Sequence, residues 1–220
     1  MGKNIKNTFV FKKMILMFIF LFIYGCSSST IIIQEDLSYV KFLSTKKTNA
    51  GILYQTGSGS QWNDDYVVTV NHVNWGKAKK NIVYSCDSGC DLKFIKSKAK
   101  NYSPVWRTSI PYENLTAVGV IEIKNLNSNS IKRRTNIVSG KDANEVSLIE
   151  NSGENIVKLA IIDTKDGMSG GPLYSDDKKI VGILIGQAIA DVGGKKQKVA
   201  VYMPYEVIKS QWEKYKSKIN

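Results

Sequence analysis

The residues with the clearest chemical potential are a glycine-flanked serine and the only histidine of the chain. Ser169 lies in the segment 166–172, which reads DGMSGGP, and His72 lies 97 positions upstream. A serine hydroxyl becomes a nucleophile when a neighbouring base takes its proton. Attack on a carbonyl then creates an oxyanion that needs fixed N–H donors, and glycines allow the backbone to supply them. The pair predicts nucleophilic catalysis, and a Gly-rich turn between two strands is the simpler alternative.

The elements that must position this pair are short β-branched and aromatic runs separated by polar turns. Candidate strands cover 40–44, 51–55, 66–70, 81–85, 92–96, 115–123, 134–138, 145–149, 156–162, 180–186 and 199–203. Many short strands at this spacing predict an all-β sandwich or pair of barrels. The segment 204–219 differs, because Pro204 opens it and apolar residues recur at helical spacing. It predicts a C-terminal amphipathic helix that packs on a barrel.

The first residues are typical of an export signal. Four lysines precede the apolar run Met14–Tyr24, which is shorter than the roughly 20 residues of a membrane-spanning helix. The segment 23–26 resembles a bacterial lipobox, with Cys26 as the lipidated (palmitoylated) first residue of the mature chain. We therefore expect a signal peptide over 1–25, a tether over 26–38 and a folded domain over 39–220. An ordinary signal peptide or an uncleaved anchor is the alternative.

Charge and cysteine content restrict the partners. The formal net charge is +12, and removal of the four N-terminal lysines would leave +8. This charge favours anionic surfaces such as a membrane, whereas the absence of a recognised motif and the export signal argue against nucleic acid. Cys86 and Cys90 predict a disulfide in an oxidising compartment. A zinc site is the alternative, but one His and no further Cys make four ligands hard to assemble, so we expect no metal or cofactor.

Two segments together resemble a known family. The segment 56–59 (TGSG) followed by 67–73 (VVTVNHV) looks like the histidine region of trypsin-like (chymotrypsin-fold) serine peptidases. The segment 166–172 followed by 179–183 (KIVGI) looks like their serine region. The resemblance covers roughly residues 50 to 210. It implies an all-β, chymotrypsin-like double six-stranded antiparallel β-barrel with a C-terminal α-helix, and a join between barrels near 97–114 or 125–130.

The resemblance also implies catalytic roles. Ser169 would be the nucleophile and His72 the general base, and the N–H groups of Gly167 and Ser169 would form the oxyanion hole. Asp91, at the entry to the strand 92–96, matches the position of the acid that orients the histidine. It follows His72 by only 19 positions, a shorter gap than in most of the family, which implies a first barrel trimmed by one hairpin.

The acid position has a second candidate, because Glu113-Asn114 also precedes a strand. We choose Asp91 because its segment is more similar to the family pattern. A Cys86–Cys90 bridge would then stiffen the loop that carries this carboxylate.

Substrate selection is read from three further residues. Asp163 lies six residues before Ser169, where trypsin-like relatives carry the acid that selects Arg or Lys, although bacterial relatives without that preference also have Asp-Thr there. Ile185 and Gly186 lie in the run expected to pair with an extended substrate.

Met168 replaces the Asp that digestive relatives use to bind a new amino terminus after cleavage of the zymogen. The resemblance therefore implies an enzyme that folds into its active form without proteolytic activation.

These observations predict a monomeric, lipid-anchored serine endopeptidase with a protein or peptide substrate and no nucleic-acid partner. Ser27 is not acidic, so an outer-membrane location on the periplasmic side is expected if the source is Gram-negative. The alternative is an inactive double-barrel lipoprotein that binds an envelope protein. The peptidase requires His72 and Ser169 to lie within hydrogen-bond reach of each other, whereas the binding module does not.

Overall fold

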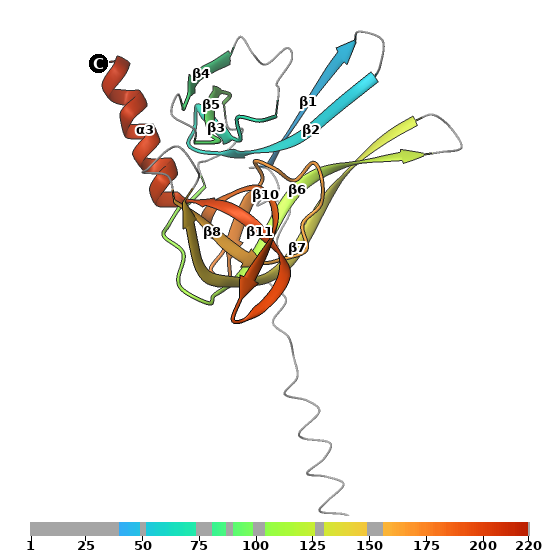
Figure 1. Cartoon of the computed structure of the whole chain (residues 1–220). Helices are drawn as coiled ribbons and strands as arrows, with labels where there is room; N and C mark the ends of the chain where they lie inside the picture. Colours follow the sequence, from blue (N-terminus) through green and yellow to red (C-terminus); the bar gives the residue numbers. More distant parts are fainter. Residues whose placement is uncertain are drawn as a thin grey trace, which may run out of the picture. The chain divides into compact units, whose positions relative to one another are not determined.

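The computed structural model describes residues 40–48, 52–73, 81–86, 90–98, 104–125, 130–148 and 156–219 (Figure 1). The predicted signal peptide, the predicted lipidation site Cys26 and the entire predicted tether 26–38 lie outside these ranges, as does residue 39. In the described ranges, no helix combines the length and the apolar character needed to cross a membrane.

The described chain forms two antiparallel β units and a C-terminal helix. The first sheet has the order β1-β2-β3-β5-β4, and the second unit is a closed barrel of order β10-β11-β8-β7-β6-β9. The bounds are β1 Val40–Thr48, β2 Ile52–Gln61, β3 Tyr66–Thr69, β4 Ile82–Ser85, β5 Lys93–Lys96, β6 Asn114–Asn125, β7 Ser130–Leu148, β8 Ile156–Ile161, β9 Pro172–Ser175, β10 Ile180–Val192, β11 Lys195–Pro204 and α3 Tyr205–Ile219. The predicted all-β class is confirmed, and the first unit is the trimmed one, an open five-stranded sheet.

Two strand predictions need correction. The segments 134–138 and 145–149 were expected to be separate strands, but residues 130–148 form the single strand β7. Its register against β8 shifts between Asp142 and Val146, and Asn144 has a φ of 53°, a conformation that Asn tolerates better than most residues. The strand therefore bends there without ending. β9 was not predicted, because it is only four residues long and begins with proline.

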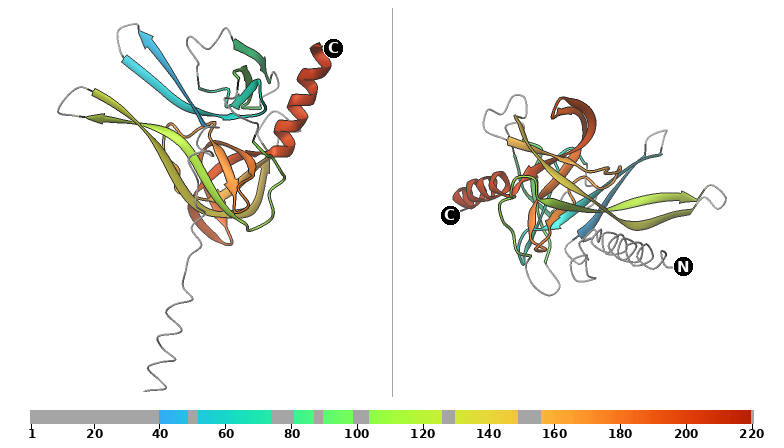
Figure 2. Two further views of the ribbon diagram at one scale, coloured as in Figure 1. Left: turned by 180° about the vertical axis from the view of Figure 1, so that it is seen from behind. Right: turned by 90° about the horizontal axis from the view of Figure 1, so that it is seen from below.

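The chain passes from the first sheet to the barrel between the end of β5 and the start of β6. Residues 125–130, the other candidate for this join, connect β6 to β7 within the barrel. The β6–β7 hairpin extends beyond the rest of the barrel (Figure 2). The two halves meet where β1 and β2 lie beside β6 and where β2 contacts the segment between β8 and β9.

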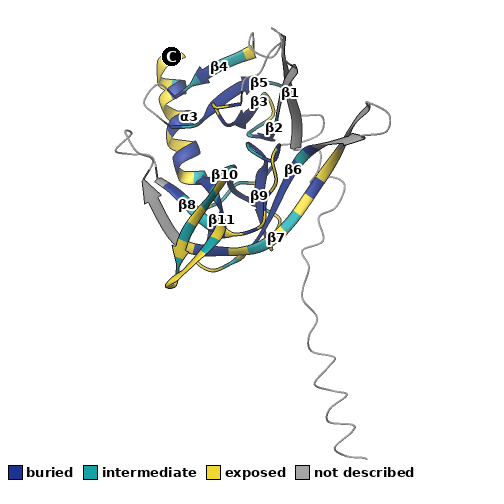
Figure 3. Cartoon of the chain, turned by 45° about the vertical axis from the view of Figure 1, so that its right-hand side comes forward, coloured by how far each residue is buried: buried dark blue, intermediate teal, exposed yellow. Residues whose placement is uncertain are grey.

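Two apolar cores support the two units (Figure 3). The core of the first sheet includes Leu92 and Phe94 together with Ile208 and Tyr215 of α3. The ring of Trp212, also in α3, lies 4.9 Å from that of Phe94 and 4.8 Å from that of Tyr66. The barrel has its own core, built from residues such as Leu115, Leu173, Val181 and Tyr202. The predicted helix thus covers apolar surface that an open sheet would otherwise expose.

Candidate active site

His72 and Asp91 are brought together by the pairing of two strands. β3 ends at Thr69, which is opposite Lys93 at the start of β5 in an antiparallel register. Residues that follow β3 therefore lie beside residues that precede β5. Asp91 Oδ1 accepts hydrogen bonds from the backbone N–H groups of Asn71 at 2.8 Å and His72 at 2.7 Å. Its Oδ2 lies 2.5 Å from His72 Nδ1.

The surroundings of Asp91 favour its ionised form. Burial raises the pKa of this carboxyl, but the hydrogen bonds and charge of His72 and the amide of Asn71 outweigh that effect and leave the pKa below its usual value. An ionised carboxylate on Nδ1 holds the proton on that nitrogen, so Nε2 becomes the basic nitrogen of the imidazole. The His72 side chain is 47% exposed, so the ring is accessible to a reacting group.

The other candidate acid has a different role. Both oxygens of the Glu113 carboxylate accept hydrogen bonds from Arg107, at 2.6 and 3.2 Å. Asn114 donates to Asp176 at 2.8 Å. Arg107 also contacts Asp177 at 3.0 Å. Glu113 therefore belongs to an ion-pair network with Arg107 and Asp177, Asn114 bonds to Asp176, and Asp91 is the acid that contacts His72.

The serine turn, residues 166–171 between β8 and β9, is held by the first sheet as well as by the barrel. The backbone N–H of Ser58 in β2 donates to the carbonyl of Ser169 at 2.7 Å. The Ser58 hydroxyl donates to the carbonyl of Gly167 at 2.9 Å and accepts from the N–H of Val120 in β6 at 2.8 Å. Ser58 thus connects β2, β6 and the serine turn. The TGSG motif supported the family resemblance but did not predict these contacts.

Gly170 brings the serine turn against the strand that leads to His72. Its φ is +85°, and a Cβ added to it would lie 2.0 Å from the carbonyl oxygen of Ser58 and 2.3 Å from Thr69 Oγ1. Only glycine fits such a contact. The residue that follows Ser169 therefore packs on Thr69, three positions before His72.

Two backbone amides of the serine turn are available as donors. Those of Met168, Gly170 and Gly171 donate to backbone carbonyls. Among the residues that the structure describes, none accepts a hydrogen bond from the N–H of Gly167 or of Ser169. A pair of preorganised N–H groups beside a nucleophile is the arrangement that stabilises a developing oxyanion.

Met168 anchors the serine turn in the barrel. Its side chain is 1% exposed, and its sulfur accepts a hydrogen bond from Asn136 Nδ2 at 3.2 Å. A Cβ added to Gly119 of β6 would lie 2.6 Å from the Cα of Met168. The bare backbone of Gly119 therefore provides the space in which Met168 is buried.

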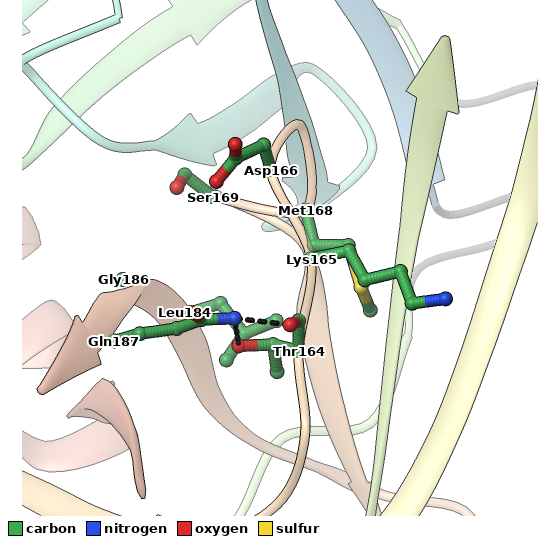
Figure 4. A pocket seen from close by; sticks show the side chains of 8 residues that line it. All are labelled: Thr164, Lys165, Asp166, Met168, Ser169, Leu184, Gly186 and Gln187. Atoms are coloured by element: carbon green, nitrogen blue, oxygen red, sulfur yellow. Dashed lines mark hydrogen bonds between the residues drawn. The ribbon is translucent and has the colours of Figure 1, made fainter. Parts of the chain in front are cut away.

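A pocket of about 230 Å³ opens beside Ser169 (Figure 4). Ser169 and Asp166 lie together at one end of it, and Thr164 and Gln187 lie at the other. Gln187 Nε2 donates to the carbonyl of Thr164 and, at 2.9 Å, to its hydroxyl. The remaining lining residues are Lys165, Met168, Leu184 and Gly186.

The sequence identified this lining only in part. Gly186 lines the pocket, whereas Ile185 packs against the core of the first sheet. Asp163, the candidate pocket carboxylate, is 79% exposed and forms an ion pair with Lys198 at 3.1 Å. Its side chain therefore faces away from the pocket although its position in the sequence suggested the reverse. Thr164 and Gln187 were missed, since their contact joins residues 23 positions apart.

The predicted disulfide between Cys86 and Cys90 is present, with the two Cα atoms 5.7 Å apart. The backbone of the same segment is bonded to Leu92, which accepts from Cys86 N–H at 3.1 Å and donates to the Cys90 carbonyl at 3.0 Å. Bridge and backbone together fix the chain immediately before Asp91. No group of three or more His, Cys, Asp or Glu residues in the described ranges could hold a metal ion.

An open antiparallel sheet that carries His72, together with a closed antiparallel barrel that carries Ser169, matches the chymotrypsin-like double-barrel fold of trypsin-like serine proteases. Among solved structures, the Rv3671c protease of M. tuberculosis H37Rv, as an inactive serine-to-alanine mutant, matches with a TM-score of 0.59 and 14% identity over 88% of this chain and 94% of that one. Its active form matches with a TM-score of 0.57 and 18% identity over 80% and 79%.

The HtrA-type protease AlgW, solved with a decapeptide, matches with a TM-score of 0.54 and 15% identity over 83% of this chain and 67% of that one. No protein-family model matches the sequence, and no curated protein has significant similarity to it. The fold is therefore shared with serine proteases at low sequence identity.

Proposed function

We propose that this protein is a serine endopeptidase that cleaves a protein or peptide substrate through an acyl-enzyme. The observation that supports this most directly is the contact between Asp91 and His72 at the end of β3, the strand on which the serine turn packs through Gly170. These are the parts that nucleophilic attack by serine requires, namely a base, a group that orients it and a hydroxyl on the facing turn.

Each group has one role in the proposed reaction. His72 Nε2 takes the proton of the Ser169 hydroxyl as its oxygen attacks the scissile carbonyl, and Asp91 stabilises the resulting imidazolium. The N–H groups of Gly167 and Ser169 donate to the oxyanion. His72 then gives the proton to the leaving amine, and the acyl-enzyme remains. In the second half, water transfers a proton to His72 as its oxygen attacks the acyl carbon. The bond between that carbon and Ser169 Oγ then breaks, His72 returns the proton to Oγ, and the carboxylic acid leaves.

The pocket suggests the kind of side chain that precedes the cleaved bond. Thr164 and Gln187 bond to each other, and Met168 and Leu184 add apolar surface. Asp163 forms an ion pair with Lys198 and is not among the lining residues, whose two charged members, Lys165 and Asp166, have opposite signs. Because the lining then carries no net charge, we propose an uncharged side chain at this position in place of Arg or Lys. The decapeptide bound to AlgW, a protein of the same fold, is consistent with a peptide ligand.

We further propose that Cys26 carries a lipid that holds the enzyme at a bacterial membrane, with the peptidase domain in the periplasm if the source is Gram-negative. The basis is the sequence alone, namely the lysines and apolar run that precede Cys26. Mass spectrometry of the chain purified from membranes would reveal an acylated N-terminal Cys26 peptide, and an unmodified peptide that includes residues before Cys26 would contradict the proposal.

The central experiment is intact-mass measurement after treatment with a fluorophosphonate, which modifies activated serines. The wild-type protein should gain one adduct, whereas Ser169→Ala should gain none. Ser210→Ala, which removes an exposed serine from α3, is the matched control and should be modified like the wild type. Equal labelling of the wild type and Ser169→Ala, or no labelling of either, would instead favour the inactive binding module.

A further inference from the structure

Lys93 is a buried cation next to the proposed catalytic acid. It occupies the first position of β5 and is 4% exposed, in a strand where Phe94 and Ile95 are also buried and Lys96 is exposed. Its ammonium group donates a hydrogen bond to the backbone carbonyl of Val73 at 3.1 Å. Val73 directly follows His72, so this lysine contacts the backbone that carries the proposed base.

Asp91 and Lys93 bind the segment 71–73, Asp91 through its backbone N–H groups and Lys93 through a backbone carbonyl. Residues two apart in an extended chain project to the same side. Asp91 accepts from the N–H groups of Asn71 and His72, and Lys93 donates to the carbonyl of Val73. The anion thus binds the donors at the start of the segment 71–73, and the cation binds an acceptor at its end.

The burial of this ammonium group is costly. An ammonium removed from water is destabilising unless it is paired and hydrogen-bonded. Burial lowers the pKa of Lys93 to about 8, and the negative charge of Asp91 partly opposes that shift. A Met side chain of similar length would fill the same space without this cost. The contacts of the ammonium group, rather than its volume, therefore explain a lysine at this position.

We infer that Lys93 is a positioning residue for His72: its bond to Val73 fixes the backbone that carries the imidazole, and its charge supports the ionised Asp91 that orients the ring. Lys93 touches no reacting atom and acts through its neighbours. The inference rests on the proposed peptidase function, but its structural content, a more ordered His72–Asp91 hydrogen bond, can be measured without any activity.

The test compares Lys93→Met with Lys96→Met, the same substitution on the exposed side of the same strand. Because the chain has one histidine, a low-field proton NMR signal from imidazole N–H can be assigned to His72 alone. We expect this signal in the wild type and in Lys96→Met, and its loss or broadening in Lys93→Met. Lys93→Arg keeps both charge and donor and should restore it.

The kinetic readout is the rate of fluorophosphonate labelling. A displacement of about 1 Å can reduce a rate by roughly 100-fold, so we expect a fall of that order in Lys93→Met and none in Lys96→Met. Urea unfolding establishes that each variant is folded, and Lys93→Leu, which also lacks both charge and donor, replaces Lys93→Met if the latter does not fold. If the folded variant keeps the NMR signal and labelling rate of the wild type, the inference about Lys93 is wrong and the peptidase proposal is unaffected. If the wild type is not labelled but the NMR signal is still lost in Lys93→Met, only the peptidase proposal is wrong.

Discussion

The two halves of the molecule hold their proposed catalytic groups in different ways. In the first sheet, the segment around His72 is fixed by side chains, since Asp91 and Lys93 bind its backbone groups. In the barrel, the serine turn is held by backbone contacts and by two hydroxyls of β2, since Ser58 donates to the carbonyl of Gly167 and Ser60 donates to that of Gly170. The carbonyl of Ser169 accepts from an amide of β2, and Gly170 donates to the carbonyl of Leu184 at 2.7 Å.

This difference follows from the architecture of each unit. The first sheet is open and its core is completed by α3, and the backbone groups of residues 71–73 bond to the side chains of Asp91 and Lys93. The barrel is closed, and its strand β6 approaches the serine turn so closely that glycine is required at Gly119, whereas β2 and β3 of the first sheet require glycine at Gly170. Substitution of Asp91 or Lys93 should therefore impair the acid–base half, and an added Cβ at Gly119 should impair the nucleophile half.

The largest effect is expected for Asp91→Asn. The amide oxygen of Asn can still accept from the backbone, but a neutral amide neither stabilises the imidazolium nor holds the required tautomer, so turnover should fall by about 10⁴-fold. The measurement is the rate of peptide hydrolysis or of fluorophosphonate labelling. Asp65→Asn, an exposed residue in the turn before β3, is the control. A decrease of less than about tenfold would place the orienting acid elsewhere.

The second largest effect is expected for Gly119→Ala in the barrel, which should slow the labelling of Ser169. In Gly119→Ala the new carbon would lie 2.6 Å from the Cα of Met168, so the serine turn must move. We expect labelling of Ser169 to slow by about 100-fold, with the NMR signal of His72 unchanged. Gly140→Ala, whose carbon would lie 1.9 Å from the carbonyl oxygen of Ile161, is the control for general loss of barrel stability. Equal slowing in both variants would mean that Met168 does not specifically anchor the turn.

Local patterns were enough to predict part of this site. His72 and Ser169 each lie in a motif of adjacent residues, and the alternation of short strands was enough for the all-β class. Asp91 was preferred over Glu113 because it opens a strand in the family pattern, and it is the acid that contacts His72. In each case, the informative residues are close together in the chain.

The remainder depends on contacts that sequence spacing does not encode. The residues between the predicted strands 134–138 and 145–149 were expected to separate them, but Asn144 adopts a positive φ and β7 continues through it. Asp163 has the spacing of a pocket acid, yet it is not among the lining residues of the pocket and instead forms an exposed ion pair with Lys198. Lys93 lies between Leu92 and Phe94, so alternation would place it in solvent. It is buried because the carbonyl of Val73 and the charge of Asp91 are its partners.

The smallest effect on catalysis is expected from the disulfide, which lies in the half that depends on side chains. The bridge joins residues separated by four positions, and closing so short a loop stabilises a fold by about 2 kcal/mol in the chain-entropy model. Cys86→Ser/Cys90→Ser should lower the free energy of unfolding by that amount, as measured in urea. Reductant should do the same to the wild type and leave the double variant unchanged.

Turnover of this variant should fall only slightly, because Asp91 would still accept from the amides of Asn71 and His72. A loss of turnover as large as that expected for Asp91→Asn would mean that the bridge, and not these hydrogen bonds, orients the carboxylate. The acid–base half would then depend on a covalent constraint, and a reducing environment would be sufficient to inactivate it while the barrel and its serine turn remained folded.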